Sequence, residues 1–132
     1  MQTPLSPKMG AAEINALSVL ALAQVGDAVF ELMVRTRLCQ SGTATARAMH
    51  LKRVRVVSAG AQSAAADKLR GSLTDEEAAV YARGRNTRVG HIPRAATRKQ
   101  YQAATALEAL WGWLWLTGRA ERLETLFELL YN

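Results

Sequence analysis

The fifteen residues from Leu20 to Val34, LALAQVGDAVFELMV, form an almost continuous apolar run that contains one glycine, Gly26, and two carboxylates, Asp27 and Glu31. Apolar residues recur here, and in most of the chain, at spacings of three and four, which is typical of amphipathic helices. No segment shows sustained two-residue alternation between turn residues. The sequence therefore predicts an all-α fold, a helical bundle.

Capping residues and glycines set the predicted helix limits. The Leu20–Val34 run belongs to a helix that begins at Asn15 or Ser18 and ends at Cys39, before Gly42. Thr74 and Glu77 form the spacing of a capping box, which predicts another helix start near Asp75. Thr43 is expected to cap a helix that ends near Val54, and Ser58 one over 59–69 that Gly71 ends. The Asp75 helix is expected to fray near Gly84. A loop over 86–93 and helices over 97–117 and 120–130 complete the prediction.

The bulk composition limits the class of protein. With 132 residues, 49% of them hydrophobic, the chain suits one domain over 1–132 with a loose N-terminus over 1–12. The single cysteine, Cys39, excludes an internal disulfide framework and favours a reducing, cytoplasmic location. We expect no signal peptide and no membrane-spanning segment, because the longest charge-free apolar stretch, 109–117, is too short.

Basic residues are separated from acidic ones along the chain. The formal net charge is +6, which favours a polyanionic partner, nucleic acid before anionic membrane. No acid lies between Glu31 and Asp67, where the arginines and lysines fit a solvated helix face. None lies between Glu77 and Glu108 either, and there RGRNTRVGHIPR (83–94) places arginines on a glycine-bearing loop that can follow a phosphate backbone.

A second apolar helix also carries an acid. In YQAATALEALWGWLWLTG (101–118) the only charged residue is Glu108. A carboxylate in an apolar helix needs compensation, either from a nearby arginine or from a divalent cation such as Mg²⁺, which prefers hard oxygen ligands. The residues alone leave both open, with the ion pair the commoner case. Gly26, beside Asp27, indicates that something approaches the helix backbone closely, and a neighbouring helix would suffice.

Four motifs, in order, carry a resemblance to a known family. VGDAVFELMV resembles the signature helix of the ribonuclease III catalytic domain, and TALEALWGWLWLTG resembles its last catalytic helix. The series ALAQVGDAVFE, VSAGAQ, LTDEEAAVYARGRN and YQAATALEALWG resembles Mini-ribonuclease III, the short branch that consists of the catalytic domain alone. The resemblance covers residues 17–126. It implies an all-α ribonuclease III-type endonuclease domain that forms a homodimer.

The resemblance also implies the reaction. It is the Mg²⁺-dependent hydrolysis of double-stranded RNA, in maturation of the large-subunit ribosomal RNA precursor, with Asp27 and Glu108 as the catalytic metal-binding acids. The sequence departs from full-length ribonuclease III at Ala23 and Thr105, where the larger enzymes have carboxylates, as in the mini branch. No double-stranded-RNA-binding module is expected to follow, so the catalytic domain itself must grip the duplex. The residues expected to do so are Arg83, Arg85, Asn86, Arg88, Arg94 and Lys99.

Several roles remain open at this point. Glu31 could position a water or pair with Arg35, and we favour the ion pair. His91 could join the RNA-binding residues or cap the loop, and we favour the cap. The tryptophans of the second helix fit burial on both sides, either in the core and against a second subunit or as a central core helix in a monomer. A large-subunit ribosomal protein could present the substrate. The alternatives are a non-catalytic RNA-binding protein on the same scaffold and a DNA-binding helix-turn-helix.

Overall fold

The computed structural model describes residues 1–87, 92, 94 and 96–131, and within them it contains helices and no β-strand. Among the described residues, no helix has the length and apolar character needed to cross a lipid bilayer. The predicted all-α fold is confirmed. The elements are α1 (Ala11–Asn15), α2 (Val19–Gln40), α3 (Ala46–Val57), α4 (Ala59–Leu69), the 3-10 turn η1 (Arg70–Ser72), α5 (Asp75–Arg85), α6 (Arg98–Leu116) and α7 (Ala120–Tyr131).

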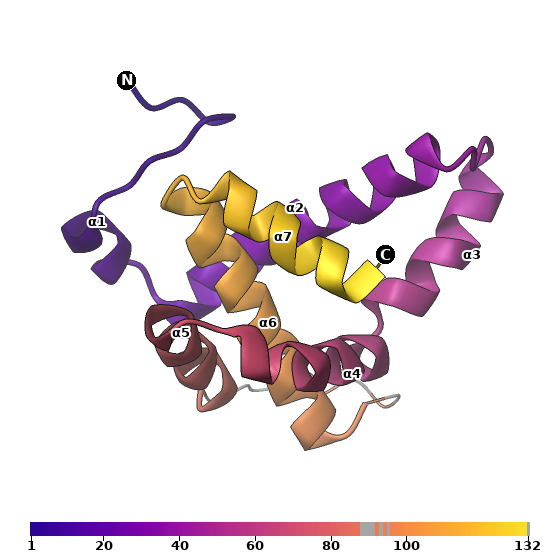
Figure 1. The fold of residues 1–132 in the computed structure, drawn as a ribbon. Coiled ribbons are helices and arrows are strands. Elements are labelled where there is room, and N and C mark those ends of the chain that lie inside the picture. The colour runs from indigo at the N-terminus through magenta and orange to yellow at the C-terminus, as the bar shows by residue number, and fades with distance from the viewer. Residues whose placement is uncertain (88–91, 93, 95, 132) are drawn as a thin grey trace.

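Helix α6 lies at the centre of the molecule and contacts α2, α4, α5 and α7 (Figure 1). Its sequence is apolar on all sides, and its tryptophans Trp111 and Trp113 are 1% and 7% exposed. Burial of this helix on both sides is therefore confirmed, and neighbours within the same chain suffice to cover both tryptophans. The core continues through Phe30 of α2, which stacks on Trp111 with the ring centroids 6.0 Å apart.

The predicted caps account for most helix starts. Ser18 and Ser58 each accept a hydrogen bond from the backbone at the start of a helix, and Thr74 and Glu77 form the predicted capping box. Thr97, which the sequence placed at a helix start without naming it as a cap, caps α6. The cap of α3 differs from the prediction. Thr45, not Thr43, caps α3, because Thr43 is buried, with its hydroxyl accepting a hydrogen bond from Lys52.

Two other helix predictions differ from the structure, and one limit agrees with it. Helix α3 ends at Val57 rather than near Val54, directly before the Ser58 cap of α4. Helix α4 has the predicted limits, 59–69, and a 3-10 turn that contains Gly71 follows it. Helix α5 does not fray at Gly84, because this glycine packs against α6, where an added Cβ would lie 2.7 Å from the Cα of Ala106.

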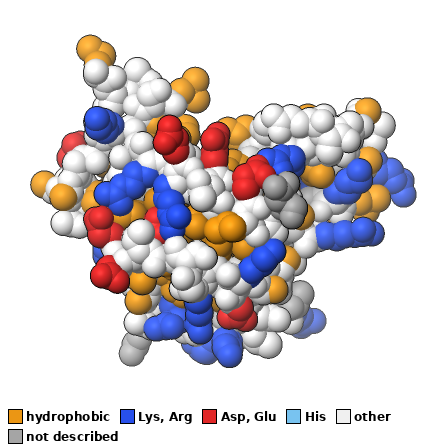
Figure 2. Space-filling model, in the orientation of Figure 1, with side chains coloured by type: hydrophobic (Ala, Val, Ile, Leu, Met, Phe, Trp, Pro, Cys, Tyr) orange, Lys and Arg blue, Asp and Glu red, His pale blue; other side chains and the backbone are white. Residues whose placement is uncertain are grey.

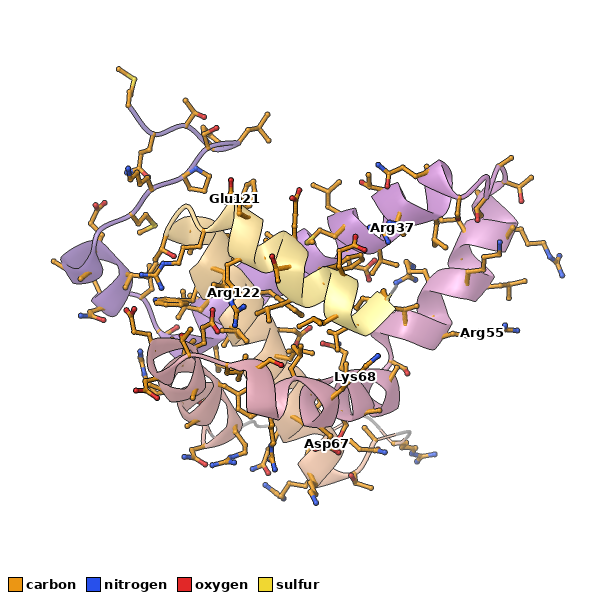
Figure 3. The ribbon with its side chains drawn as sticks, viewed as in Figure 1. Arg37, Arg55, Asp67, Lys68, Glu121 and Arg122 are labelled. Carbon is orange, nitrogen blue, oxygen red and sulfur yellow. The ribbon has the colours of Figure 1, made fainter. Side chains whose placement is uncertain are left out.

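Helices α2 and α3 form an arm that extends from the bundle (Figure 1). None of the residues of α3 is buried, and its Arg55 projects away from the protein body (Figure 3). The C-terminal helix α7 is held to α5 by Arg122, which donates two hydrogen bonds of 2.8 Å to Glu77. This ion pair connects α5 and α7 within the bundle.

Candidate active site

Helices α2 and α6 cross at two glycines with their backbones almost in contact. A Cβ added at Gly26 would lie 2.6 Å from the carbonyl carbon of Glu108, and closer still to its oxygen. A Cβ added at Gly112 would lie 2.9 Å from the carbonyl carbon of Leu22. Side chains at these positions would force the helices apart, so only glycine permits this approach. The close approach expected at Gly26 is thus to a neighbouring helix.

The crossing brings Asp27 and Glu108 together. Asp27 follows Gly26 and is exposed, whereas Glu108 lies half-buried at the point where α6 touches α2. Between Ala104 and Leu114, Glu108 is the one residue of α6 that is not buried. The carboxyl group of Asp27 lies close enough to Glu108 to raise the pKa of Glu108. Two acids that are far apart in the sequence therefore form one pair at the surface of the bundle.

The surroundings of the pair disfavour two full negative charges. Burial, and then the charge of Asp27 and the hydrogen bond with it, raise the pKa of Glu108 to about 8, against a smaller opposing effect of a hydrogen bond from Gln62. Glu108 consequently holds a proton at neutral pH. The raised pKa of Glu108 therefore reflects both its burial and its closeness to Asp27.

No basic side chain compensates this pair in the part of the chain that the structure describes. The ion pairs found there involve Glu31, Glu76, Glu77 and Glu128, and neither Asp27 nor Glu108. The arginine that could have neutralised a buried acid is therefore not seen among the described residues. Two adjacent hard oxygen donors, one of them exposed, suit a divalent cation such as Mg²⁺, which commonly takes one or two protein carboxylates.

The two positions at which a larger metal site would need acids hold other residues. Ala23 is buried in α2, and the hydroxyl of Thr105 donates to the carbonyl of Tyr101 within α6. Among the described residues there is no group of three or more His, Cys, Asp or Glu side chains placed to hold a metal ion. The described site offers two carboxylates.

Glu31, one turn after Asp27, is engaged in ion pairs. It accepts hydrogen bonds from Arg35 at 3.2 Å and from Arg53 at 2.7 Å. The expected pairing of Glu31 with Arg35 is confirmed, and Arg53 of α3 is an additional partner. This places two guanidinium groups one helical turn away from Asp27, where Glu31 holds them.

Basic side chains gather where α5 ends and α6 begins. Figure 2 shows Lys and Arg along the lower edge of the molecule, and Arg83, Arg85, Asn86, Arg94 and Lys99 are all exposed. None of the four basic residues in this set forms an ion pair with a described acid. The Arg88 and His91 predictions lie outside the described residues. His50, the other histidine, is exposed on α3 beside Arg53, with 3.3 Å between Nδ1 and Nη2.

Gln62 of α4 belongs to the site, although sequence reasoning did not single it out. Its side chain is 4% exposed and lies beside Glu108. The signal was present, because Gln62 shares helical spacing with Ala65, Ala66 and Leu69, all of them buried. A polar residue on the buried face of a helix is a stronger indication of a functional site than a polar residue on an exposed face.

Comparisons with known proteins agree with this geometry. Residues 20–119 match the family model described as Ribonuclease III domain. The chain is 40% identical over 112 residues to the Mini-ribonuclease 3 of Symbiobacterium thermophilum, covering 85% of this chain and 86% of that one. It is 42% identical to that of Gloeobacter violaceus, covering 92% and 87% of the two chains. A crystal structure of a Fusobacterium nucleatum protein superposes with a TM-score of 0.81 at 30% identity, covering 89% and 93%.

Proposed function

The chain belongs to the ribonuclease III domain family, in its Mini-ribonuclease 3 branch, and on that premise we propose that it cleaves double-stranded RNA with Mg²⁺ at Asp27 and Glu108. It is an endoribonuclease of the ribonuclease III type. The observation that carries the proposed site is the adjacency of these two acids with no basic partner among the described residues. A protein that only bound RNA would gain nothing from two acids beside phosphate.

The two acids have different surroundings and therefore different tasks. Asp27 is exposed and would be accessible to a hydrated cation, whereas Glu108 is half-buried on the packed helix α6. A bound divalent cation supplies Lewis-acid stabilisation of charge on the phosphoryl group and makes a water molecule more acidic. Asp27 and Glu108 would together hold this cation, and two carboxylate oxygens are a donor set that suits Mg²⁺.

The exposed cations at the end of α5 and the start of α6 are proposed to hold the duplex. Arg83, Arg85, Asn86, Arg94 and Lys99, with Arg88, would contact phosphates and 2′-hydroxyls, because A-form RNA is recognised mainly by shape and backbone. The absence of acidic partners for the described arginines and lysine leaves their charge available to phosphate. Such contacts would be insensitive to sequence and sensitive to salt.

We extend the proposal to the biological setting. The RNA substrate is the precursor of large-subunit ribosomal RNA, in the cytoplasm, with a ribosomal protein as a candidate for presenting it, and the enzyme acts as a homodimer that cuts both strands. Two leucines of α2, Leu20 and Leu32, are 42% and 62% exposed and supply apolar surface for association. The tryptophans of α6 are not needed for this argument, since the chain covers Trp111 and Trp113 itself.

The test uses a long RNA duplex, incubated with and without Mg²⁺. We expect Mg²⁺-dependent cleavage by the wild-type protein, no cleavage by Asp27→Asn, and duplex binding by both. Asp67→Asn is the matched control, because Asp67 is exposed on α4 and forms no ion pair with a described residue. Cleavage that persists in Asp27→Asn would overturn the catalytic assignment. A wild-type protein that binds the duplex but never cuts it would favour the non-catalytic alternative.

A further inference from the structure

Gln62 has an unusual combination of burial and incomplete hydrogen bonding. It lies on the face of α4 that packs against α6, with 4% of its surface exposed. Its Nε2 donates to the carbonyl oxygen of Val57, at 3.1 Å, where α3 ends. Its Oε1 is buried and has no hydrogen-bond partner among the described residues. The side chain is thus anchored at one end and unsatisfied at the other.

An unsatisfied buried oxygen is costly and needs a reason. Leaving a buried acceptor without a partner costs about 1–3 kcal/mol, and most buried polar atoms in native proteins avoid this. An apolar residue would satisfy the packing of α4, whose neighbouring buried positions are Ala65, Ala66 and Leu69. Since the amide lies beside Glu108, the reason is to be sought in the acid pair.

We propose that Gln62 is a positioning residue for the divalent cation: its amide nitrogen orients the Glu108 carboxylate, and its unpartnered oxygen accepts a hydrogen bond from water that arrives with the cation. This inference rests on the proposed function, since it concerns the same site. It adds a third helix, α4, to a site that otherwise comes from α2 and α6. Gln62 is not itself a ligand in this scheme.

Two physical arguments support this role. First, a half-buried carboxylate on the surface of α6 can rotate about its side-chain bonds, and a fixed donor selects one orientation. Gln62 is fixed, because its own nitrogen donates a hydrogen bond to the Val57 carbonyl. Second, Mg²⁺ keeps several of its waters when it binds protein carboxylates, and those waters are donors in need of acceptors. Outer partners of this kind are worth about 10–100-fold in metal affinity.

The test measures metal binding directly, without RNA. Gln62→Met keeps the length of the side chain and removes both polar atoms. Mn²⁺ binding to the metal-free protein is measured by electron paramagnetic resonance, and we expect Gln62→Met to weaken it about 10–100-fold. The melting temperature should hold or rise, because the variant also removes an unsatisfied buried oxygen. Gln40→Met is the matched control, at the exposed end of α2, and should bind Mn²⁺ as the wild type does.

The outcomes separate this inference from the function on which it rests. Wild-type Mn²⁺ affinity in a folded Gln62→Met protein would overturn the role of Gln62 and leave Asp27 and Glu108 as the site. A wild-type protein that binds no Mn²⁺ would refute the metal site itself. If Gln62→Met does not fold, the side-chain amide signal of Gln62 in the wild type decides by nuclear magnetic resonance. It should shift during a Mg²⁺ titration, and a signal that stays fixed would overturn the inference.

Discussion

The substitution Gly26→Ala tests whether the crossing of α2 and α6 holds the two acids together. The added Cβ would lie 2.6 Å from the carbonyl carbon of Glu108 and 2.7 Å from the amide nitrogen of Gly112, whereas ordinary contact begins at 3.4 Å. The obstructing atoms are backbone atoms of a buried helix, so no side chain can rotate away. Helices α2 and α6 must therefore separate by about 1 Å or more, a distance that also moves Glu108 relative to Asp27.

The energetic cost follows from two opposing terms. Overpacking a core costs about 1–3 kcal/mol even where side chains can adjust, and a backbone obstacle places this site at or above the upper end. Replacing a helical glycine by alanine returns up to about 1 kcal/mol through helix propensity. We expect a net loss of about 2–3 kcal/mol, which lowers the melting temperature of a domain of this size by about 10 °C.

The matched control is Gly60→Ala in α4. A Cβ at Gly60 meets Gln100 Nε2 at 3.6 Å, an ordinary contact, so only the propensity gain remains and the melting temperature should hold or rise. Thermal unfolding by circular dichroism measures both variants, and cleavage of a duplex below the melting temperature measures the acid geometry. We expect Gly26→Ala to lose most cleavage while Gly60→Ala keeps it. A Gly26→Ala protein with wild-type stability and cleavage would refute the backbone-contact reasoning.

Two further predictions concern charge and stability. In EDTA, Glu108→Gln should be more stable than the wild type at pH 8, by up to about 4 kcal/mol. The pKa of Glu108 is about 8 in the folded protein and 4.5 as a free group, so wild-type stability falls as pH rises between these values, and the difference should vanish near pH 4.5. Arg122→Met should cost about 3 kcal/mol at neutral pH, because Glu77 is left buried without its partner. Arg122 lowers the pKa of Glu77 below 4.5, so the ion pair stabilises the fold above that pH, and the deficit should shrink as urea unfolding is repeated at lower pH.

The helix starts could be predicted because capping is local. Ser18, Ser58, Thr74 and Thr97 each act within three residues of their own position, so the information lies in a short window. The predictions that were wrong concern positions where a contact with a residue distant in sequence decides between two locally possible structures. Thr43 and Thr45 are both able to cap a helix, and the contact of Thr43 with Lys52 decides between them. Gly84 has the low helix propensity of any glycine, but its close packing against Ala106 of α6 requires a glycine within the helix.

The candidate site also has a part that the sequence predicts and a part that only the structure shows. Asp27 and Glu108 could be recognised as isolated charges in apolar helices, because the contrast exists in the sequence. That no described arginine or lysine pairs with them could not be foreseen in a chain with seventeen such residues. The pairing of Glu77 with Arg122 and the role of Gln62 depend on contacts between helices that are distant in sequence, and no local pattern specifies which helix packs on which.

The adjacency of Asp27 and Glu108 lowers the stability of the fold. A core helix gains nothing by placing Glu108 next to Asp27, since burial and repulsion together disfavour ionisation of Glu108. The neighbouring positions of α6 offset this cost, because every other residue from Ala104 to Leu114 is buried. The glycine crossing then leaves the pair no room to relax by separating the helices. Protonation of Glu108 relieves the repulsion in the absence of metal, and the same packing would hold both oxygens in place for the proposed divalent cation.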